Sequence, residues 1–177
     1  MTKANEWLDV PVIDFATKNI LCTICDILLN DESSAIISFV CDKKGLKKCN
    51  CTLYLKDIIS KSYDGIIVKN NDVIKNLLNI KTINNTLSYK NIILNKTVLN
   101  SKGEFIGILR DMIFDLTAGY ILGFEVSEGY FDDIFTGRKI IKAGSGYFFS
   151  DNNIVVPYEG IIKEQGRGLL NLGRIGE

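Results

Sequence analysis

A pair of alternating segments that occurs twice is the feature that most constrains how this chain can fold. The clearer copy, GEFIGILRDMIFDLTAGYILGFEVS, runs from Gly103 to Ser127. Apolar residues recur at nearly every second position in both of its halves, with Arg110 as an interruption. Such alternation is typical of strands with one buried face. Leu116–Gly119 separates the halves, and Gly119 can adopt the positive φ of a tight turn. We therefore predict two strands joined by a short turn.

A weaker copy, NILCTICDILLNDESSAIISFV, occupies Asn19–Val40, and its Asp26 corresponds to Asp111 of the clearer copy. Short strands are expected before the two copies and again after them, at Val10–Asp14, Lys96–Asn100, Asp64–Val68 and Asn152–Val156. One order of elements that occurs twice indicates a tandem duplication.

The duplication defines the expected domains. With 177 residues, the chain is long enough for two small domains, which we place at residues 1–70 and 92–177. Between them, residues 71–91 form the expected linker, because its apolar residues lie at helical spacing and Asn71 or Asp72 could cap a short helix. Many short strands at close spacing favour small barrels. The predicted fold is mainly all-β, with two small antiparallel barrels in tandem and a short helical linker.

Composition limits the chemistry that the chain can perform. It has no His, which excludes Ser-His-Asp and Cys-His catalysis and imidazole metal ligands. Lys plus Arg equals Asp plus Glu, 21 each, so the chain lacks the bulk attraction that a basic protein has for nucleic acid. It contains no P-loop or GxGxxG motif for a nucleotide. We expect no cofactor and no enzymatic activity.

The predicted location is the cytoplasm. No apolar run approaches the roughly 20 residues that span a bilayer, and the N-terminus MTKANEWLDVPVIDF does not resemble a signal peptide. Five Cys, an odd number, fit a reducing compartment better than a disulfide framework.

The clearer copy resembles the PRC-barrel domain family. GEFIGILRDMIFDLTAGYILGFEV, followed by NNIVVPYEGI, shares with it a Gly-rich first turn, an Asp near the middle of the second strand, a Thr-x-Gly turn and a closing Val-Val-Pro. The residues that carry the resemblance are Gly103, Gly107, Asp111, Asp115, Gly119 and Pro157. It covers about residues 92–163. Residues 10–69 match more loosely, with Cys22 in place of Gly107 and no Pro after Val68.

The resemblance implies a pair of PRC-type barrels with a docking function. The family includes part of the photosynthetic reaction-centre H subunit, the C-terminal half of a ribosome maturation factor, and small proteins of spore formers and archaea. Its members are mostly non-catalytic docking modules, which implies a scaffold or adaptor that binds a protein partner. Because a fold does not fix a function, two alternatives stay open: an RNA- or ribosome-associated maturation factor, and a thiolate zinc protein. A homo-oligomer is also compatible with the sequence.

Cysteines supply the residues for the zinc alternative. Cys22 and Cys25, with Cys49 and Cys51, could form a four-thiolate site. The strand prediction opposes it, because residues three apart on a strand point to opposite faces. Free Cys is also a common small core residue, so we expect structural thiols and no metal.

Three aspartates are candidates for chemistry. Asp26 and Asp111 are equivalent in the repeat, and Asp115 would share a strand face with Asp111. Paired carboxylates could perform acid–base chemistry or bind a hard cation. We favour a structural role, because the same residue recurs in both copies. Each Asp would accept hydrogen bonds from nearby turn amides and fix its hairpin.

A basic cluster is the first candidate partner-binding segment. It consists of Lys43, Lys44, Lys47 and Lys48. These side chains could contact phosphate or an acidic partner, and solvated surface charge is the alternative.

An aromatic loop and the C-terminal tail are the other candidates. The loop Gly129–Gly137 holds Tyr130, Phe131 and Phe135, which either bind a protein partner or fold back and cap the barrel. Residues 166–177 either become ordered on a partner or close an open sheet edge.

Overall fold

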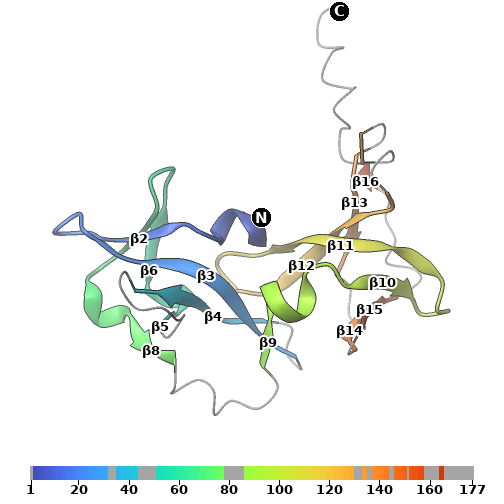
Figure 1. Cartoon of the computed structure of the whole chain (residues 1–177), viewed down its shortest axis with the longest axis horizontal. Helices are drawn as coiled ribbons and strands as arrows, with labels where there is room; N and C mark the ends of the chain where they lie inside the picture. Colours follow the sequence, from blue (N-terminus) through green and yellow to red (C-terminus); the bar gives the residue numbers. More distant parts are fainter. Residues whose placement is uncertain are drawn as a thin grey trace, which may run out of the picture. The chain divides into compact units, whose positions relative to one another are not determined.

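The computed structural model describes residues 2–31, 35–43, 51–77, 86–129, 133–134, 137–143, 146–150, 152–157 and 164–165. The chain forms two compact units, each built around one sheet (Figure 1). The first unit consists of Thr2–Asn91 and Asp115–Tyr120, and the second of Ile92–Phe114 and Ile121–Glu177. None of the helices in the described residues has the length and apolar character that crossing a bilayer requires.

The first sheet has the strand order β6-β7-β2-β3-β4-β5-β8, and β9 pairs with β3. Its strands are β2 (Pro11–Asp14), β3 (Ile20–Asn30), β4 (Ala35–Asp42), β5 (Cys51–Leu53), β6 (Ile58–Lys61), β7 (Ile66–Val68), β8 (Lys75–Asn76) and β9 (Thr86–Ser88). The neighbours β2 and β7 run parallel, and the other pairs are antiparallel.

The second sheet has the strand order β14-β15-β10-β11-β12-β13-β16. Its strands are β10 (Thr97–Asn100), β11 (Phe105–Phe114), β12 (Ile121–Ser127), β13 (Lys139–Lys142), β14 (Phe148–Phe149), β15 (Asn153–Val156) and β16 (Glu164–Gln165). Here β10 and β15 are the parallel pair.

The two strand orders correspond position by position, with β2 to β8 in the first sheet matching β10 to β16 in the second. Both sheets curl into half-barrels (Figure 1), so the predicted all-β, barrel-like fold is confirmed. The parallel pair in each sheet was not expected from the sequence. It arises because β7 and β15 return beside β2 and β10 after a long excursion of the chain, and a tight hairpin could not make that connection.

The expected helical linker differs from the observed structure. In its described part, residues 71–91 contain the 3₁₀ helix η3 (Asn71–Val73) and also supply β8 and β9 to the first sheet. Asn70 caps η3, accepting a hydrogen bond from the Asp72 N–H at 3.1 Å. Asn and Val are weak helix formers, so pairing of the next residues with β5 outweighs helix extension. The remaining elements are β1 (Thr2–Lys3), η1 (Ala4–Trp7), η2 (Leu55–Asp57) and the π-helix η5 (Tyr89–Ile93).

Each unit has its own apolar core. In the first unit, the fully buried Trp7 and Phe39 stack with ring centroids 4.8 Å apart. In the second unit, the buried Phe124 makes edge-to-face contacts with Tyr147 and Phe149 at 5.0 and 6.3 Å. Aromatic pairs of these geometries add about 1 kcal/mol to the free energy gained by burying their area.

Gly107 marks a close approach between β11 and β12. A Cβ atom at this position would lie 2.5 Å from the Ser127 carbonyl oxygen and 2.6 Å from Val126 Cγ1. Cys22 occupies the equivalent position in the first sheet, and Cys41 the position of Val126, as the strand registers show. The two sheets therefore fill one place with different side chains.

The other family-like residues lie in turns or at strand ends. Gly103 and Gly119 have φ values of +80° and +76°, which suit turn glycines. The Gly119 N–H donates to the Asp115 carbonyl oxygen at 2.8 Å. Pro157 follows β15, beside Gly146.

Candidate functional site

Asp26 holds three elements of the first unit together. Its side chain is 8% exposed and accepts hydrogen bonds from the Ile27 and Lys90 N–H groups at 2.8 and 2.9 Å. The Ser88 hydroxyl donates to its second carboxylate oxygen. Because Ser88 ends β9 and Lys90 lies in η5, this carboxylate connects β3 to β9 and η5 through hydrogen bonds.

Asp111 occupies the equivalent position in the second sheet. It is 4% exposed and accepts a hydrogen bond from the Met112 N–H at 2.8 Å. Both aspartates lie where the pairing of their strands shifts register, just after Ile24 and Leu109. The expected donors were turn amides. In both units the observed donor is the N–H of the next residue along the strand. The bulge takes this N–H out of the hydrogen bonding between the paired strands.

Asp115 and Asp14 are the aspartates that accept turn amides. Asp115 follows the end of β11, so the predicted strand face shared with Asp111 does not form. Its Oδ1 accepts the Thr117 and Ala118 N–H groups at 2.8 and 2.7 Å. These two hydrogen bonds lower the pKa of Asp115 below its usual value, and the bond from Ala118 has the larger effect.

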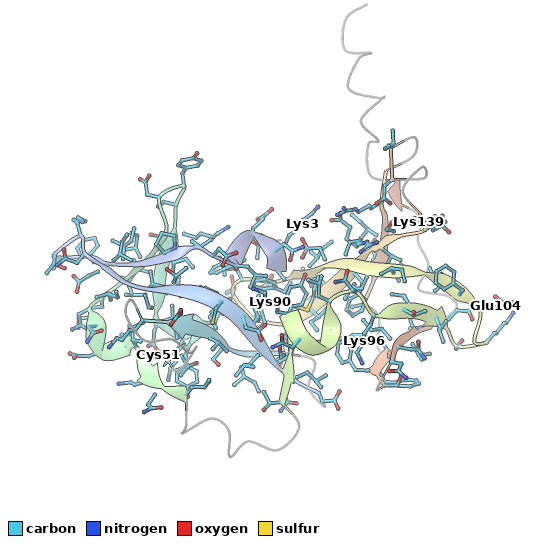
Figure 2. The ribbon with its side chains drawn as sticks, in the orientation of Figure 1. Lys3, Cys51, Lys90, Lys96, Glu104 and Lys139 are labelled. Atoms are coloured by element: carbon cyan, nitrogen blue, oxygen red, sulfur yellow. The ribbon has the colours of Figure 1, made fainter. Side chains whose placement is uncertain are left out.

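Asp14 ends β2 in the same manner. Its Oδ1 accepts the Ala16 and Thr17 N–H groups at 2.9 Å each, and the bond from Thr17 is the main cause that lowers its pKa. In the second unit, Asn100 accepts the Lys102 and Glu104 N–H groups at 2.9 Å each. Figure 2 shows Glu104 at this turn, between β10 and β11.

The cysteines have two different states. Cys22, Cys41 and Cys51 are buried and not disulfide-bonded, whereas Cys25 is disulfide-bonded. Cys49 lies outside the described residues. The Cys41 thiol donates to the Phe39 carbonyl oxygen at 3.7 Å, and its pKa is raised because it is hydrogen-bonded to Cys22 and buried.

These states bear on the four-thiolate alternative. Because Cys25 is disulfide-bonded, it offers no thiolate to a metal. Among the described residues, no three Cys, Asp or Glu side chains come together in a way that could hold an ion. The disulfide also differs from the expectation of reduced thiols.

Most of the predicted partner-binding residues lie outside the described part of the chain. This holds for Lys44, Lys47, Lys48, Tyr130, Phe131, Phe135 and the tail 166–177. Lys43 is described, and it follows β4 with a half-buried side chain.

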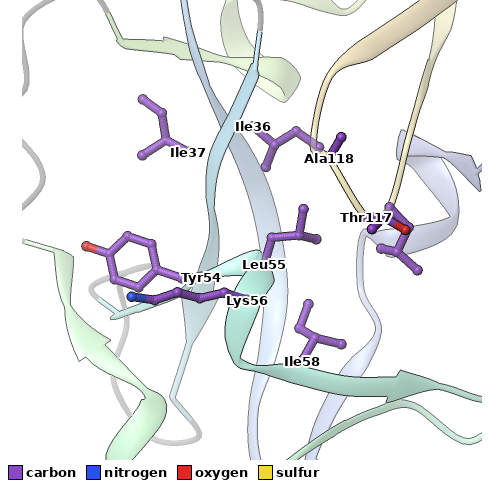
Figure 3. A pocket seen from close by; sticks show the side chains of 9 residues that line it. Ile36, Ile37, Tyr54, Leu55, Lys56, Ile58, Thr117 and Ala118 are labelled. Atoms are coloured by element: carbon purple, nitrogen blue, oxygen red, sulfur yellow. The ribbon is translucent and has the colours of Figure 1, made fainter.

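An open groove in the first unit is a candidate binding feature among the described residues. One half has a volume of about 460 Å³, and we call it the apolar half because most of its lining side chains are apolar. The lining residues are Ile36, Ile37, Tyr54, Leu55, Lys56, Ile58, Leu116, Thr117 and Ala118. Figure 3 shows Ile36, Leu55 and Ile58 among them. One wall is the turn Asp115–Tyr120, which the Ile36 N–H holds through a 2.9 Å hydrogen bond to the Gly119 carbonyl oxygen. Another part of the lining is η2 (Leu55–Asp57), which carries Leu55. We call the whole feature the Tyr54 groove.

A polar half continues the Tyr54 groove. It encloses about 410 Å³ and shares Tyr54 and Lys56 with the apolar half. Lys69 and Lys75 line it too. The Lys56 Nζ lies 5.7 Å from the centroid of the Tyr54 ring, and Figure 3 shows the two side chains alongside each other. A cation over an aromatic face is attracted to it, so Lys56 stands at the boundary of the two halves.

The polar half carries more positive than negative charge. Besides Lys56, Lys69 and Lys75, its lining includes the carboxylates of Asp57 and Asp72. Asn70 donates through Nδ2 to the Asp72 carboxylate at 3.2 Å. Within the described part of the chain, none of the three lysines forms an ion pair with a carboxylate.

None of the groove residues was predicted from the sequence as a functional residue. They come from four separate stretches, residues 36–37, 54–58, 69–75 and 116–118. The one local signal is Leu116, a large apolar residue in a predicted turn, which is 39% exposed.

Fold and groove together define a mainly β protein with two barrel-like sheets and a surface groove that has one apolar and one basic half. Residues 85–172 match the PRC-barrel domain family, so the chain contains one PRC-barrel domain. That match begins at residue 85 and leaves most of the first sheet outside it. The chain is also 26% identical, over 132 residues, to Uncharacterized protein YrrD of Bacillus subtilis (strain 168). The aligned region covers 75% of this chain and 73% of that protein.

Proposed function

We propose that the protein is a non-enzymatic scaffold that binds a protein partner through the Tyr54 groove. The observation that carries the proposal is the apolar half, where Leu55, Ile58 and Leu116 line an opening to solvent. Burying such side chains against a partner gains about 25 cal/mol per Å² of apolar surface.

A non-catalytic role agrees with the chemistry of the chain. It has no His, and the carboxylates of Asp26, Asp14 and Asp115 accept backbone amides that stabilise bulges and turns. The PRC-barrel match agrees with a docking module. A turnover lost in Asp111→Asn with an unchanged fold would overturn this part of the proposal.

We also propose that the first sheet is another PRC-type barrel, and that the two barrels arose by tandem duplication. The shared strand order, including the parallel pair in each sheet, supports this. The cytoplasmic location and the contribution of the predicted basic and aromatic loops to partner binding belong to the same proposal.

The test is a comparison of proteins that co-purify with the tagged full-length chain and with two variants. Leu116→Asp places a charge in the apolar half, on a side chain that is exposed enough to change without unfolding the unit. Tyr63→Asp is the matched control, because Tyr63 is a fully exposed apolar residue of the same unit that does not line the groove.

We expect a partner that is retained by the wild type and Tyr63→Asp, survives nuclease treatment, and is lost with Leu116→Asp. Equal retention by both variants would contradict the groove as the binding site. Loss of all partners after nuclease or at moderate salt would favour the RNA-associated alternative instead.

A further inference from the structure

The side chains that line the two halves of the Tyr54 groove indicate which kind of ligand it would bind. Resting on the proposed function, we infer that the partner supplies an extended segment in which apolar side chains are followed within a few residues by Asp or Glu. The apolar side chains occupy the apolar half, and the carboxylates lie against the lysines of the polar half.

Continuity of the groove is the first support. Tyr54 and Lys56 line both halves, so the two halves are neighbours on the surface and within reach of one segment. Successive side chains on the same face of an extended segment are spaced by about 7 Å. An apolar residue and an acidic residue that are a few positions apart can therefore reach the two halves together.

Unpaired positive charge is the second support. Lys56, Lys69 and Lys75 line the polar half, and within the described residues no carboxylate forms an ion pair with any of them. Two carboxylates also line it, and Asp72 already accepts a hydrogen bond from Asn70. The remaining excess of positive charge favours an anionic group on the ligand.

The position of Lys56 argues for a carboxylate-bearing peptide over a nucleic acid. Its Nζ lies 5.7 Å from the Tyr54 ring centroid, so the cation covers the aromatic face on which a base would stack. The neighbouring surface is aliphatic, with Ile36, Leu55 and Leu116. Aliphatic side chains suit apolar residues of a peptide and offer no recognition of bases.

A phage-displayed library of random peptides, selected on the full-length protein, provides the probe. We expect the selected sequences to combine apolar residues with nearby Asp or Glu. Synthetic copies of them should bind Leu116→Asp at a level too weak to measure. They should bind the Lys56→Glu, Lys75→Glu double variant about tenfold more weakly than the wild type. Lys142→Glu in the second unit, where Lys142 is exposed on β13, is the charge control and should bind as the wild type does.

The outcomes separate the inference from the proposed function. Peptides that need Leu116, carry no acidic residue and bind the double-lysine variant normally would overturn the inference while leaving the groove as a binding site. Peptides that ignore both Leu116 and the lysines would overturn both. Circular dichroism of each variant shows whether a loss of binding reflects unfolding, and urea unfolding of the same samples gives a second check.

Discussion

The two sheets share one strand order but differ in the side chains at equivalent positions. The clearest difference lies where β3 pairs with β4 in the first sheet and β11 pairs with β12 in the second. In the first unit, Cys22 and Cys41 occupy this place and are hydrogen-bonded to each other. In the second unit, the equivalent residues are Gly107 and Val126, which approach so closely that no Cβ fits on Gly107. The repeat therefore preserves the summed volume at this contact, not the residue type, as cores with repacked side chains do.

A second difference concerns charge. Asp14 and Asn100 close equivalent turns. Asp14 accepts the amides two and three residues further on, and Asn100 accepts those two and four residues further on. Asp14 is ionisable and Asn100 is not, so the two turns differ in their response to acid.

The largest expected effect tests the volume comparison. Gly107→Ala places a Cβ 2.5 Å from the Ser127 carbonyl oxygen, so β11 and β12 must separate. We expect the free energy of unfolding, measured with urea, to fall by about 3 kcal/mol. Gly103→Ala is the control, since a Cβ there has no heavy atom within 4 Å and meets only the strain of φ +80°. That strain costs about 1 kcal/mol. Equal losses for the two variants would contradict the close approach.

The next effect concerns the carboxylate that holds β9. Asp26→Ala removes the acceptor of the Ser88 hydroxyl and of the Ile27 and Lys90 N–H groups. Because buried donors lose their partner, we expect a destabilisation of about 2 kcal/mol, measured by urea unfolding. In a double-mutant cycle with Ser88→Ala, the interaction energy between the two residues should be about 1 kcal/mol. Strictly additive losses would show that the Ser88–Asp26 bond contributes nothing.

A smaller effect separates the two turns by pH. The folded-state pKa of Asp14 lies below its usual value of about 3.9. Its ionised form therefore stabilises the fold above that value, and the contribution disappears as the pH falls through the folded-state pKa. We expect Asp14→Asn to lower the free energy of unfolding slightly at neutral pH and to reduce the acid dependence of stability. If the acid dependence of stability were unchanged in this variant, other carboxylates such as Asp115 would be its cause.

The smallest effect concerns thiol chemistry. Cys22, Cys41 and Cys51 are buried and not disulfide-bonded. Burial raises the pKa of Cys51, whereas the hydrogen bond with Cys41 lowers the pKa of Cys22. Because burial shields these three sulfur atoms from the reagent, we expect slow reaction with a thiol reagent in the folded protein and at least three reactive thiols after unfolding without reductant. Five reactive thiols would show that Cys25 is reduced in solution.

The hairpin of the second unit was predicted well because its pattern is local. Alternation indicated β11 and β12, and Arg110, which interrupts it, lies at the register shift between Leu109 and Asp111. The turn was predictable because Gly119 adopts the positive φ that its residue type allows.

The remaining features depend on contacts that a local pattern does not contain. The strands β8 and β9 are two and three residues long, and they are strands only because β5 and β3 pair with them. The parallel pairs join residues far apart in the chain. The Tyr54 groove draws on four separate stretches, so no spacing in the sequence could have brought Leu55 and Leu116 together.

The attachment of β9 to Asp26 also sets an order of events during synthesis. Asp26 leaves the ribosome long before Ser88 and Lys90, so its carboxylate stays without these two donors until the chain has grown past residue 90. The parallel pairing of Val12 with Ile66 has the same character, because the partner strand is made much later. A nascent chain that stops at residue 70 should therefore be poorly protected from protease. One that has extended past residue 91 gains β8, β9 and the hydrogen bonds to Asp26, and its protection should rise over that short interval of synthesis.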